Sequence, residues 1–242
     1  MDPNAEERPL NSQYFTEGAV LLVDKPQGWT SFDVVNKLRG KIRNLFQLKN
    51  IKVGHAGTLD PMATGLLIVC TGKDTKRINE YQDRSKVYTG TVTFGATTAS
   101  YDAETEVDAT FPFEHITLAL LEQAKEKFLG EIEQVPPMFS AIKVDGQPLY
   151  KMARKGESIK VEARKVHIYE INFTRIELPE VDFEVHCSKG TYIRSLAFDL
   201  GKALKSGAYL SALRRTKIGE FEVDKAMSVT EWVEWMDGKI HA

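Results

Sequence analysis

The sequence predicts an α+β protein built on a long, mixed and mostly antiparallel sheet with helices on its faces. Three observations support this fold class. Residues 86–94 alternate along a run with strong β propensity, and residues 66–70 form an unbroken apolar run typical of a buried strand. Residues 32–46 and 116–129 place apolar side chains at helical spacing. With 242 residues, the chain is long enough to bury a sizeable core.

The elements of the first half follow from caps, turns and periodicity. Residues 1–18 contain few apolar side chains and are predicted to form a flexible tail. Thr30 and Ser31 follow a Pro/Gly turn and can cap the helix over 32–46, and Thr117 can cap the helix over 116–129. The other elements expected before residue 129 are a strand at 19–23, a strand at 66–70, a short helix at 74–81, a strand at 86–94 and an acidic loop at 97–108.

The second half is predicted to extend the sheet. Pro136 and Pro137 interrupt the chain, and Asp145-Gly146 is a hairpin-turn signal. Gly190 is the hinge of a strand-to-helix junction, with Thr191 as a candidate cap. The elements expected here are a short helix at 149–155, paired strands at 161–173 and 181–187, a helix with the buried stripe Ile193, Leu196, Ala197 and Leu200, short strands at 209–215 and 220–223, and a terminal helix at 228–236.

Composition and charge are those of an ordinary globular protein. Hydrophobic residues make up 42%, charged residues 27%, and the net charge is -2, which leaves room for local basic patches. Cys70 and Cys187 lie in no paired motif, so we expect reduced thiols. The five histidines show no metal-ligand spacing, so no structural zinc is expected. No apolar run reaches the length of a signal segment or a membrane span, and the expected location is cytoplasmic.

Residues 54–65 are predicted to form a shaped loop, Gly-His-Ala-Gly-Thr-Leu-Asp-Pro-Met-Ala-Thr-Gly. Three glycines and a proline do not suit a regular helix or strand. The loop opens directly onto the apolar run at 66–70, which would make it a rigid platform for functional groups. Its only ionisable side chains are His55 and Asp60. An Asp-Pro pair that merely starts a turn is the ordinary alternative.

Two basic segments are candidates for contact with nucleic acid. Residues 37–52 contain six basic residues and no acidic one, and residues 135–156 interleave basic with aromatic side chains. Solvated helix faces are the simpler alternative for both segments. By contrast, residues 102–133 contain nine acids and two bases, a stretch that should point away from nucleic acid.

The string at 54–65 closely resembles the active-site loop of the TruB family of pseudouridine synthases. Four further stretches resemble the same family: Lys25-Pro26-Gln27-Gly28 with Ser31-Phe32-Asp33, Lys86-Val87-Tyr88, Val135 to Ala141, and Ser188 to Arg194. The resemblance implies the pseudouridine synthase fold, with a central catalytic cleft that holds Asp60. It also implies conversion of uridine 55 in the T arm of tRNA to pseudouridine, without cofactor or metal.

The resemblance assigns roles to individual residues. The target uridine is stacked inside the tRNA and must be flipped out. Asp60 would be the nucleophile, attacking either the ribose or the uracil. Arg194 would pair with Asp60 and keep it ionised, and Tyr88 would stack on the uracil and help to move the C5 proton. The substrate-binding positions implied are His55 against the RNA, Tyr192 in the pocket wall, Asp102 as partner of the arginine, Leu213 lining the uracil site and Lys25 supporting the loop.

The chain departs from the family pattern at its C-terminal end. Bacterial members often carry an RNA-binding PUA domain, whereas only residues 216–242 follow Arg215. We therefore expect a single catalytic domain over 19–242, with no PUA domain and with a tRNA-contacting insertion around 135–165. The expected partner is the T-arm stem-loop of tRNA, bound by a monomer that contacts no membrane.

Two other functions compete with this hypothesis. A tRNA-binding or folding factor that has lost catalysis would not need the intact trio of Asp60, Tyr88 and Arg194. A hydrolase with Asp60 as nucleophile on phosphate would need a metal-binding acid cluster or a phosphate-cradling loop before a helix. The loop at 54–65 is instead followed by a predicted strand.

Overall fold

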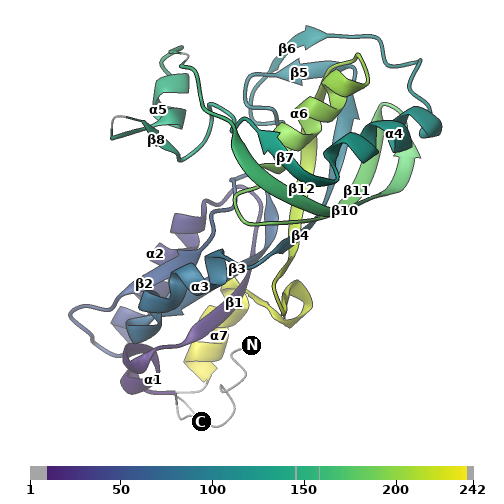
Figure 1. The fold of residues 1–242 in the computed structure, drawn as a ribbon. Helices are drawn as coiled ribbons and strands as arrows, with labels where there is room; N and C mark the ends of the chain where they lie inside the picture. The colour runs from purple at the N-terminus through teal and green to yellow at the C-terminus, as the bar shows by residue number, and fades with distance from the viewer. Residues whose placement is uncertain (1–9, 145, 158, 239–242) are drawn as a thin grey trace. The chain divides into compact units, whose positions relative to one another are not determined.

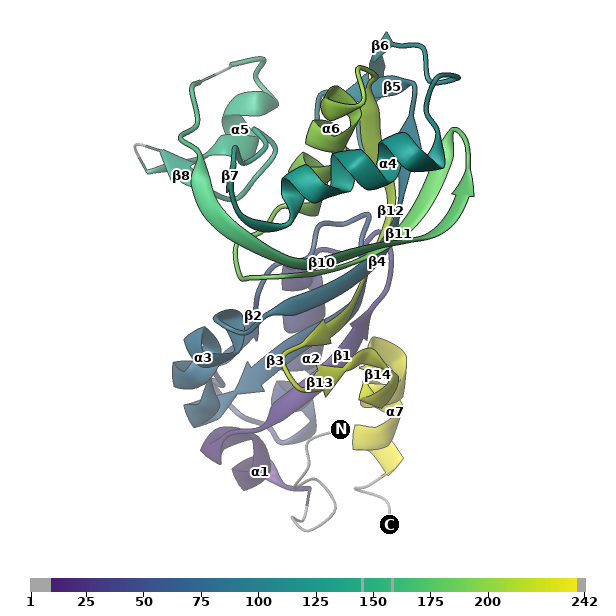
Figure 2. The same cartoon turned by 45° about the vertical axis from the view of Figure 1, so that its right-hand side comes forward.

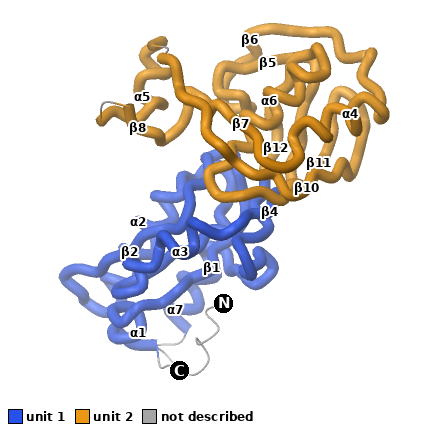
Figure 3. The backbone as a smooth tube through the Cα atoms, viewed as in Figure 1, with its two compact units in different colours: residues 1–88, 214–242 blue, residues 89–213 orange. Residues whose placement is uncertain are grey.

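The computed structural model describes residues 10–144, 146–157 and 159–238. The chain divides into two compact units (Figure 3): unit 1 contains residues 1–88 and 214–242, and unit 2 contains residues 89–213. Strands β4 (Lys86–Phe94) and β12 (Ala208–Ile218) each contribute residues to both units. That the two units act as one catalytic domain stays a prediction.

The strands form the long mixed sheet that the sequence predicts (Figure 1). Hydrogen-bonded neighbours follow the order β14-β1-β3-β12-β4-β11-β10-β7, with β2 beside β3 and β13 beside β12. The β1–β3, β2–β3, β10–β11, β10–β7 and β12–β13 pairs are antiparallel, whereas β1–β14 and β3–β12 are parallel. The bounds of these strands are β1 Val20–Lys25, β2 Val53–Ala56, β3 Thr64–Thr71, β7 Gly130–Gln134, β10 Arg164–Glu177, β11 Glu180–Cys187, β13 Phe221–Glu222 and β14 Met227–Ser228.

Unit 1 packs helices α1 (Ser12–Glu17), α2 (Ser31–Leu45) and α7 (Val229–Gly238) on the strands β1 and β3. The α2 helix begins as predicted, because the Thr30 hydroxyl accepts from the Asp33 N–H while the Asp33 carboxylate accepts from the Thr30 N–H. The apolar faces meet in one core, and the Trp232 Nε1–H donates to the Leu22 carbonyl at 2.9 Å. A short helix, α3 (Ile78–Gln82), follows the 3₁₀ helix at Gly72–Arg77.

The predicted tail includes an ordered helix. Tyr14 and Phe15 in α1 are buried in the unit 1 core, and Asn11 caps the helix by accepting from the Tyr14 N–H. The prediction of a flexible tail over 1–18 is therefore wrong for 12–17, and its part over 1–9 lies outside the described residues. Its few apolar residues are aromatic and meet partners distant in sequence, a packing that local composition does not reveal.

Unit 2 packs helices α4 (Leu118–Lys125) and α6 (Ile193–Ala203) on one face of β4, β10 and β11 (Figure 2). All four residues of the predicted stripe of α6 are buried there. The remaining elements of the unit are the β5–β6 pair (Ala96–Thr98 and Val107–Thr110), the 3₁₀ helix at Glu126–Phe128, the β8–β9 pair (Lys143–Val144 and Gln147–Pro148) and helix α5 (Leu149–Ala153).

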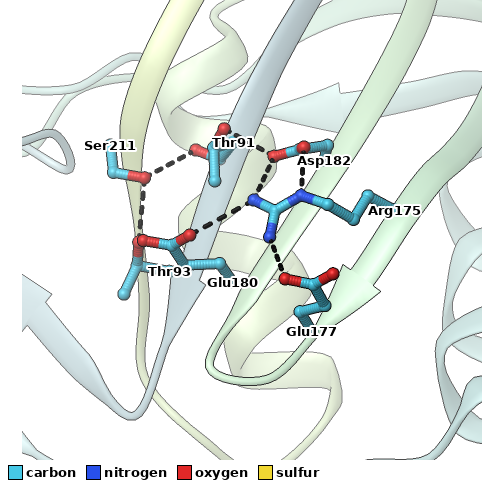
Figure 4. A network of polar contacts seen from close by, with 7 residues as sticks. All are labelled: Thr91, Thr93, Arg175, Glu177, Glu180, Asp182 and Ser211. Carbon is cyan, nitrogen blue, oxygen red and sulfur yellow. Dashed lines mark hydrogen bonds and ion pairs between the residues drawn. The ribbon is translucent and has the colours of Figure 1, made fainter.

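The opposite face of this sheet carries a polar network (Figure 4). The Arg175 guanidinium donates to Asp182 at 2.6 Å and also binds two further carboxylates, those of Glu177 and Glu180. Asp182 in turn accepts from the Thr91 hydroxyl at 2.7 Å. The hydrogen bond from Arg175 is the main reason why the pKa of Asp182 lies below its ordinary value. The network links β10 and β11 to β4 on the solvent side of the sheet.

Three local predictions need correction. The loop predicted at 54–65 is shorter, because Gly54 to Ala56 pair with β3 as strand β2 and Thr64 and Gly65 belong to β3. The loop predicted at 97–108 has β5 and β6 at its ends. Thr191 does not cap α6: its hydroxyl donates to the Ser188 carbonyl, and the cap residue is Tyr192. No helix within the described ranges is long and apolar enough to cross a membrane.

Candidate active site

Asp60 lies in the segment 57–63, which connects β2 to β3 in unit 1. The Asp60 side chain is partly exposed, and the Asp60 carbonyl accepts from the Ala63 N–H at 3.1 Å in a tight turn. Antiparallel pairing of β2 with β3, in the register Ala56 to Ile68, fixes both ends of this segment. The aspartate is therefore displayed on a short loop between two hydrogen-bonded strands, as the sequence predicts for a functional platform.

The loop is held on one side by the start of α2 and the turn before it. The Ser31 hydroxyl donates to the Leu59 carbonyl at 3.1 Å and accepts from the Leu59 N–H at 2.8 Å. The Gly28 N–H donates to the Pro61 carbonyl at 2.8 Å. These contacts satisfy backbone groups on both sides of Asp60, so that its position depends on the β1–α2 connection.

Lys25 lies at the end of β1 and is completely buried. Its ammonium donates to the Trp29 carbonyl at 2.6 Å and to the Pro26 carbonyl at 2.9 Å, with the Pro61 carbonyl at 3.5 Å. A buried ammonium needs such acceptors, because desolvation penalises the charge. These contacts fit the supporting role predicted for Lys25 within unit 1.

Arg215 holds the loop from the other side, a role that the sequence did not reveal. It is 1% exposed, its Nε–H donates to the Leu66 carbonyl at 2.8 Å, and its Nη2 donates to the Gly57 carbonyl at 3.1 Å. The parallel pairing of Arg215 with Gly65 brings its backbone beside β3. Arg215 thus joins β12 to Gly57 at the start of the Asp60 segment and to Leu66 in β3, the strand that follows the segment.

His55 lies on β2, opposite Val69 of β3. Its Nδ1 atom is buried and has no hydrogen-bond partner. Burial, and secondarily the nearby positive charge of Arg215, lower the pKa of His55 below its ordinary value. A histidine whose neutral form is favoured suits a positioning contact, the role predicted for this residue.

Tyr88 and Leu213 lie on the two strands that contribute to both units. Tyr88 is on β4 and is 8% exposed, and Leu213 is on β12 and is also 8% exposed. The division between the units falls directly after Tyr88 and directly after Leu213. Both predicted site residues are therefore buried residues of the sheet.

Arg194 lies in the first turn of α6 in unit 2 and is 4% exposed. Its Nη1 donates to the Ser100 carbonyl at 3.2 Å, and its Nη2 donates to the Phe139 carbonyl at 2.9 Å. Nη1 also lies 3.4 Å from Oδ2 of Asp102, which is completely buried. The structure thus brings together the predicted pair of Arg194 and Asp102.

The Asp102 carboxylate is itself fixed by its neighbours. Its Oδ1 accepts from the Ser100 hydroxyl at 2.5 Å and from the Glu104 N–H at 3.0 Å. Its Oδ2 has no hydrogen-bond partner and faces the guanidinium. A guanidinium held by a buried carboxylate and two carbonyls keeps one orientation, because losing any partner would leave buried polar groups unsatisfied.

Tyr192 precedes Arg194 and is held through its backbone by Gln134 at the end of β7. The Gln134 Nε2 donates to the Tyr192 carbonyl at 3.0 Å, and its Oε1 accepts from the Tyr192 N–H at 2.7 Å. The Ser195 hydroxyl donates to the Val135 carbonyl at 2.8 Å. Gln134 is 2% exposed, and no local pattern singles it out, because its partner is 58 residues away in the sequence.

Within each unit, then, the predicted residues are grouped. In unit 1, Lys25 contacts the segment that carries Asp60, and His55 lies on the strand before it. In unit 2, Arg194 contacts Asp102, and Tyr192, two residues before Arg194, is bound through its backbone to the buried Gln134. The Ser31 hydroxyl binds Leu59, and the Ser100 hydroxyl binds Asp102. Both serines occur in stretches that resemble turns and caps, so the sequence did not identify them as residues that support the candidate site.

Two protein-family models match this chain. Residues 43–193 match the family described as TruB family pseudouridylate synthase (N terminal domain), and residues 194–236 match the tRNA pseudouridylate synthase B C-terminal domain. The protein is therefore an enzyme of the pseudouridine synthase class, an isomerase. More particularly, the chain belongs to the TruB family.

Curated relatives and a solved structure agree with this assignment. Two proteins named tRNA pseudouridine synthase B are similar to this chain. The one from Flavobacterium johnsoniae is 58% identical, and the match covers 93% of this chain and 99% of the relative. The one from Phocaeicola vulgatus is 54% identical, and the match covers 92% of this chain and 95% of the relative. The structure of an H/ACA RNP bound to a substrate RNA containing 2'-deoxyuridine matches with a TM-score of 0.67 and 28% identity. That match covers 95% of this chain and 56% of the other, so this chain spans a little over half of it.

Proposed function

We propose that this enzyme converts uridine 55 in the T arm of tRNA to pseudouridine, with Asp60 as the nucleophile. The curated relatives named tRNA pseudouridine synthase B support tRNA as the substrate, since they align with nearly the whole chain. The observation that carries the proposal is the setting of Asp60, a partly exposed carboxylate on a loop whose backbone is bound by Lys25, Ser31 and Arg215.

The reaction is an isomerisation and needs no external reactant. The bond between C1′ and N1 breaks, the uracil reorients, a bond between C1′ and C5 forms, and C5 loses its proton while N1 gains one. Asp60 forms the transient covalent bond, on either the ribose or the uracil, and the target base is flipped out to reach it. In this proposal Tyr88 stacks on the base, and Arg194 supplies the positive charge that favours the ionised nucleophile.

The remaining candidates are proposed to bind or position the RNA. They are His55, Tyr192, Asp102, Leu213 and Lys25. The segment 135–165 is proposed to contact tRNA, because it exposes Lys143, Lys151 and Arg154, and the Arg154 guanidinium lies 5.6 Å from the ring centroid of Tyr150. Exposed cations beside an aromatic ring suit phosphate contact and base stacking.

The first experiment uses a T-arm stem-loop RNA labelled with tritium at C5 of the target uridine. We expect the wild type to release tritium, and Asp60→Ala to bind the RNA but release none. A second RNA with the label at another uridine tests the position. Binding by the wild type without release would favour a catalytically silent tRNA-binding factor, and release by Asp60→Ala would exclude Asp60 as the nucleophile.

A further inference from the structure

One edge of helix α2 carries a row of side chains, which we call the α2 stripe: the exposed Phe32 and Arg43 and the half-buried Asn36 and Arg39. Their spacing of i, i+4, i+7 and i+11 places them along one line of the helix. Phe32 is 58% exposed, and the guanidinium carbon of Arg39 lies 5.9 Å from its ring centroid. Nη2 of Arg39 donates to Oδ1 of Asn36 at 2.5 Å, which links three of the four residues.

The stripe begins beside the loop that carries Asp60. Phe32 directly follows Ser31, whose hydroxyl forms both hydrogen bonds to the backbone of Leu59. Both partners belong to unit 1, so this neighbourhood is fixed within one compact body. From there the stripe runs along α2 for about three turns, or roughly 16 Å at 1.5 Å per residue.

The stripe lies on the edge of α2 that faces away from α7. Lys41 is nine residues after Phe32 and therefore about half a turn away around the helix, and it pairs with Asp237 of α7. The α7 helix packs on β14 and β1, whereas β2 lies on the other side of β3. Since α2 contacts both α7 and β2, the stripe is on the β2 side, where His55 and the Asp60 loop also lie.

The chemistry of the stripe matches single-stranded or looped RNA. A lone exposed apolar residue needs no explanation, but Phe32 has a cation beside its ring, and the stripe contains a second arginine and no acid. Arginine binds phosphate through its planar fork, and an exposed aromatic ring stacks on any base. Asp33, the acid nearest in sequence, is already bound to Thr30 at the helix cap.

We infer that the α2 stripe binds the substrate RNA next to the nucleotide that enters the Asp60 loop. Phe32 stacks on an unpaired base, and Arg39 and Arg43 contact phosphates that follow it along the strand. The inference rests on the proposed function, since it assigns a further contact surface to the same substrate. It also reduces the set of basic residues in 37–52 that are expected to contact RNA, because Lys41 forms an ion pair with Asp237 of α7.

The test compares RNA binding and turnover by Phe32→Ala, Phe32→Tyr and Arg39→Ala with two matched controls. Leu118→Ala removes an apolar side chain that is also 58% exposed but lies in unit 2, and Lys76→Ala removes an exposed cation elsewhere in unit 1. Affinity for the T-arm stem-loop is measured by fluorescence anisotropy at several salt concentrations. Tritium release gives kcat and KM.

We expect Phe32→Ala to weaken binding by about tenfold, the effect of losing one stacked base, while Phe32→Tyr keeps wild-type affinity. Arg39→Ala should weaken binding and reduce the slope of log affinity against log salt by about 0.7 to 0.9, the value for one phosphate. The controls should stay within about twofold of the wild type, and kcat at saturating RNA should change little in every variant.

Two outcomes would overturn the inference. Equal loss of affinity in Arg39→Ala and Lys76→Ala would show that only net charge matters, and unchanged affinity in Phe32→Ala would remove the stacking contact. A failure of the proposed function is distinguishable, because there the wild type itself would release no tritium. If Phe32→Ala instead changed the sedimentation behaviour of the protein and not its affinity for RNA, Phe32 would belong to a contact between copies of this chain.

Discussion

At the scale of single residues, the site depends on buried polar side chains that bind the main chain. In unit 1, Lys25 and Arg215 reach the carbonyls around the Asp60 loop. In unit 2, Arg194 reaches the Ser100 and Phe139 carbonyls, and Gln134 binds the Tyr192 backbone at the start of α6. Burying such a group costs free energy unless it is hydrogen-bonded. Each of these side chains therefore stabilises the one conformation of the bound segment in which its hydrogen bonds form. The loop that carries Asp60 is thus positioned by buried side chains, whereas Tyr88 is positioned by strand β4 and Arg194 by helix α6.

Gln134 is predicted to be a positioning residue. Gln134→Leu removes both hydrogen bonds that the Gln134 amide forms with the Tyr192 backbone, while the Tyr192 carbonyl keeps the bond from the Leu196 N–H. We expect the free energy of unfolding to fall by about 2–4 kcal/mol, and kcat to fall by about 10- to 100-fold with KM within about threefold. Gln134→Glu keeps the acceptor for the Tyr192 N–H, so its kcat should be intermediate.

The control for Gln134 is Gln123→Leu on the exposed side of α4, which should leave both stability and kcat unchanged. Urea unfolding gives the stability, and tritium release at varied RNA concentration separates kcat from KM. A Gln134→Leu protein with lowered stability but wild-type kcat would show that the glutamine is structural only.

His55 predicts a pH dependence of stability. Because its pKa is lowered in the folded state, the unfolded chain takes up a proton near pH 6.5 while the folded protein does not. The contribution of His55 is thus complete above about pH 6.5 and is lost as the pH falls from there through the folded-state pKa. When measured by urea unfolding, the free energy of unfolding should fall less between pH 7.5 and pH 5.5 in His55→Gln than in the wild type.

At the scale of elements, β3 depends on glycine where it meets β12. Gly65 has φ +103°, and an added Cβ would lie 2.3 Å from the Arg215 carbonyl oxygen. The parallel pairing of these two residues brings Arg215 beside the Asp60 loop. Thus a close approach of two backbones in unit 1, and not a flexible loop, explains this glycine.

Gly65→Ala should therefore destabilise the protein by at least about 2 kcal/mol, through the left-handed backbone and the clash together. Gly40→Ala is the matched variant: Gly40 lies within α2, and no atom beyond its chain neighbours and the backbone of its own helix lies within 4 Å of an added Cβ. For Gly40→Ala we expect the free energy of unfolding to rise by about 0.5–1 kcal/mol, because alanine favours the helix. Thermal and urea unfolding measure both, and equal effects at the two positions would contradict this explanation.

At the scale of the whole molecule, charge is distributed unevenly along a chain of net charge -2. The acids of 102–133 are in unit 2, where Asp102 is buried against Arg194 and others pair with lysines, as Glu131 does with Lys165. The six bases at 37–52 belong to α2 and the segment after it in unit 1. RNA affinity should therefore come from local patches and not from overall attraction.

The corresponding prediction concerns salt. If several phosphates are contacted, the affinity for the T-arm stem-loop should fall steeply with salt, with a slope of log affinity against log salt larger than about 2 in magnitude. Anisotropy titrations between about 50 and 200 mM salt measure it. A slope below about 2 would contradict a footprint of several phosphates, whatever the catalytic activity.

The sequence by itself determined the family resemblance, the α+β class, the strand at 86–94 and the capped helix α2, because periodicity and caps are local properties. It also singled out Asp60 and Arg194, whose residue types and motifs are distinctive. Three features could not be predicted locally: Gly54 belongs to a strand, the aromatic residues of α1 are buried, and Arg215 and Gln134 each bind the backbone beside candidate residues of their own unit. These features depend on partners that are distant in the sequence; Arg215 and Leu66, for example, are 149 residues apart. Local propensity depends only on neighbouring residues, so it does not predict such contacts.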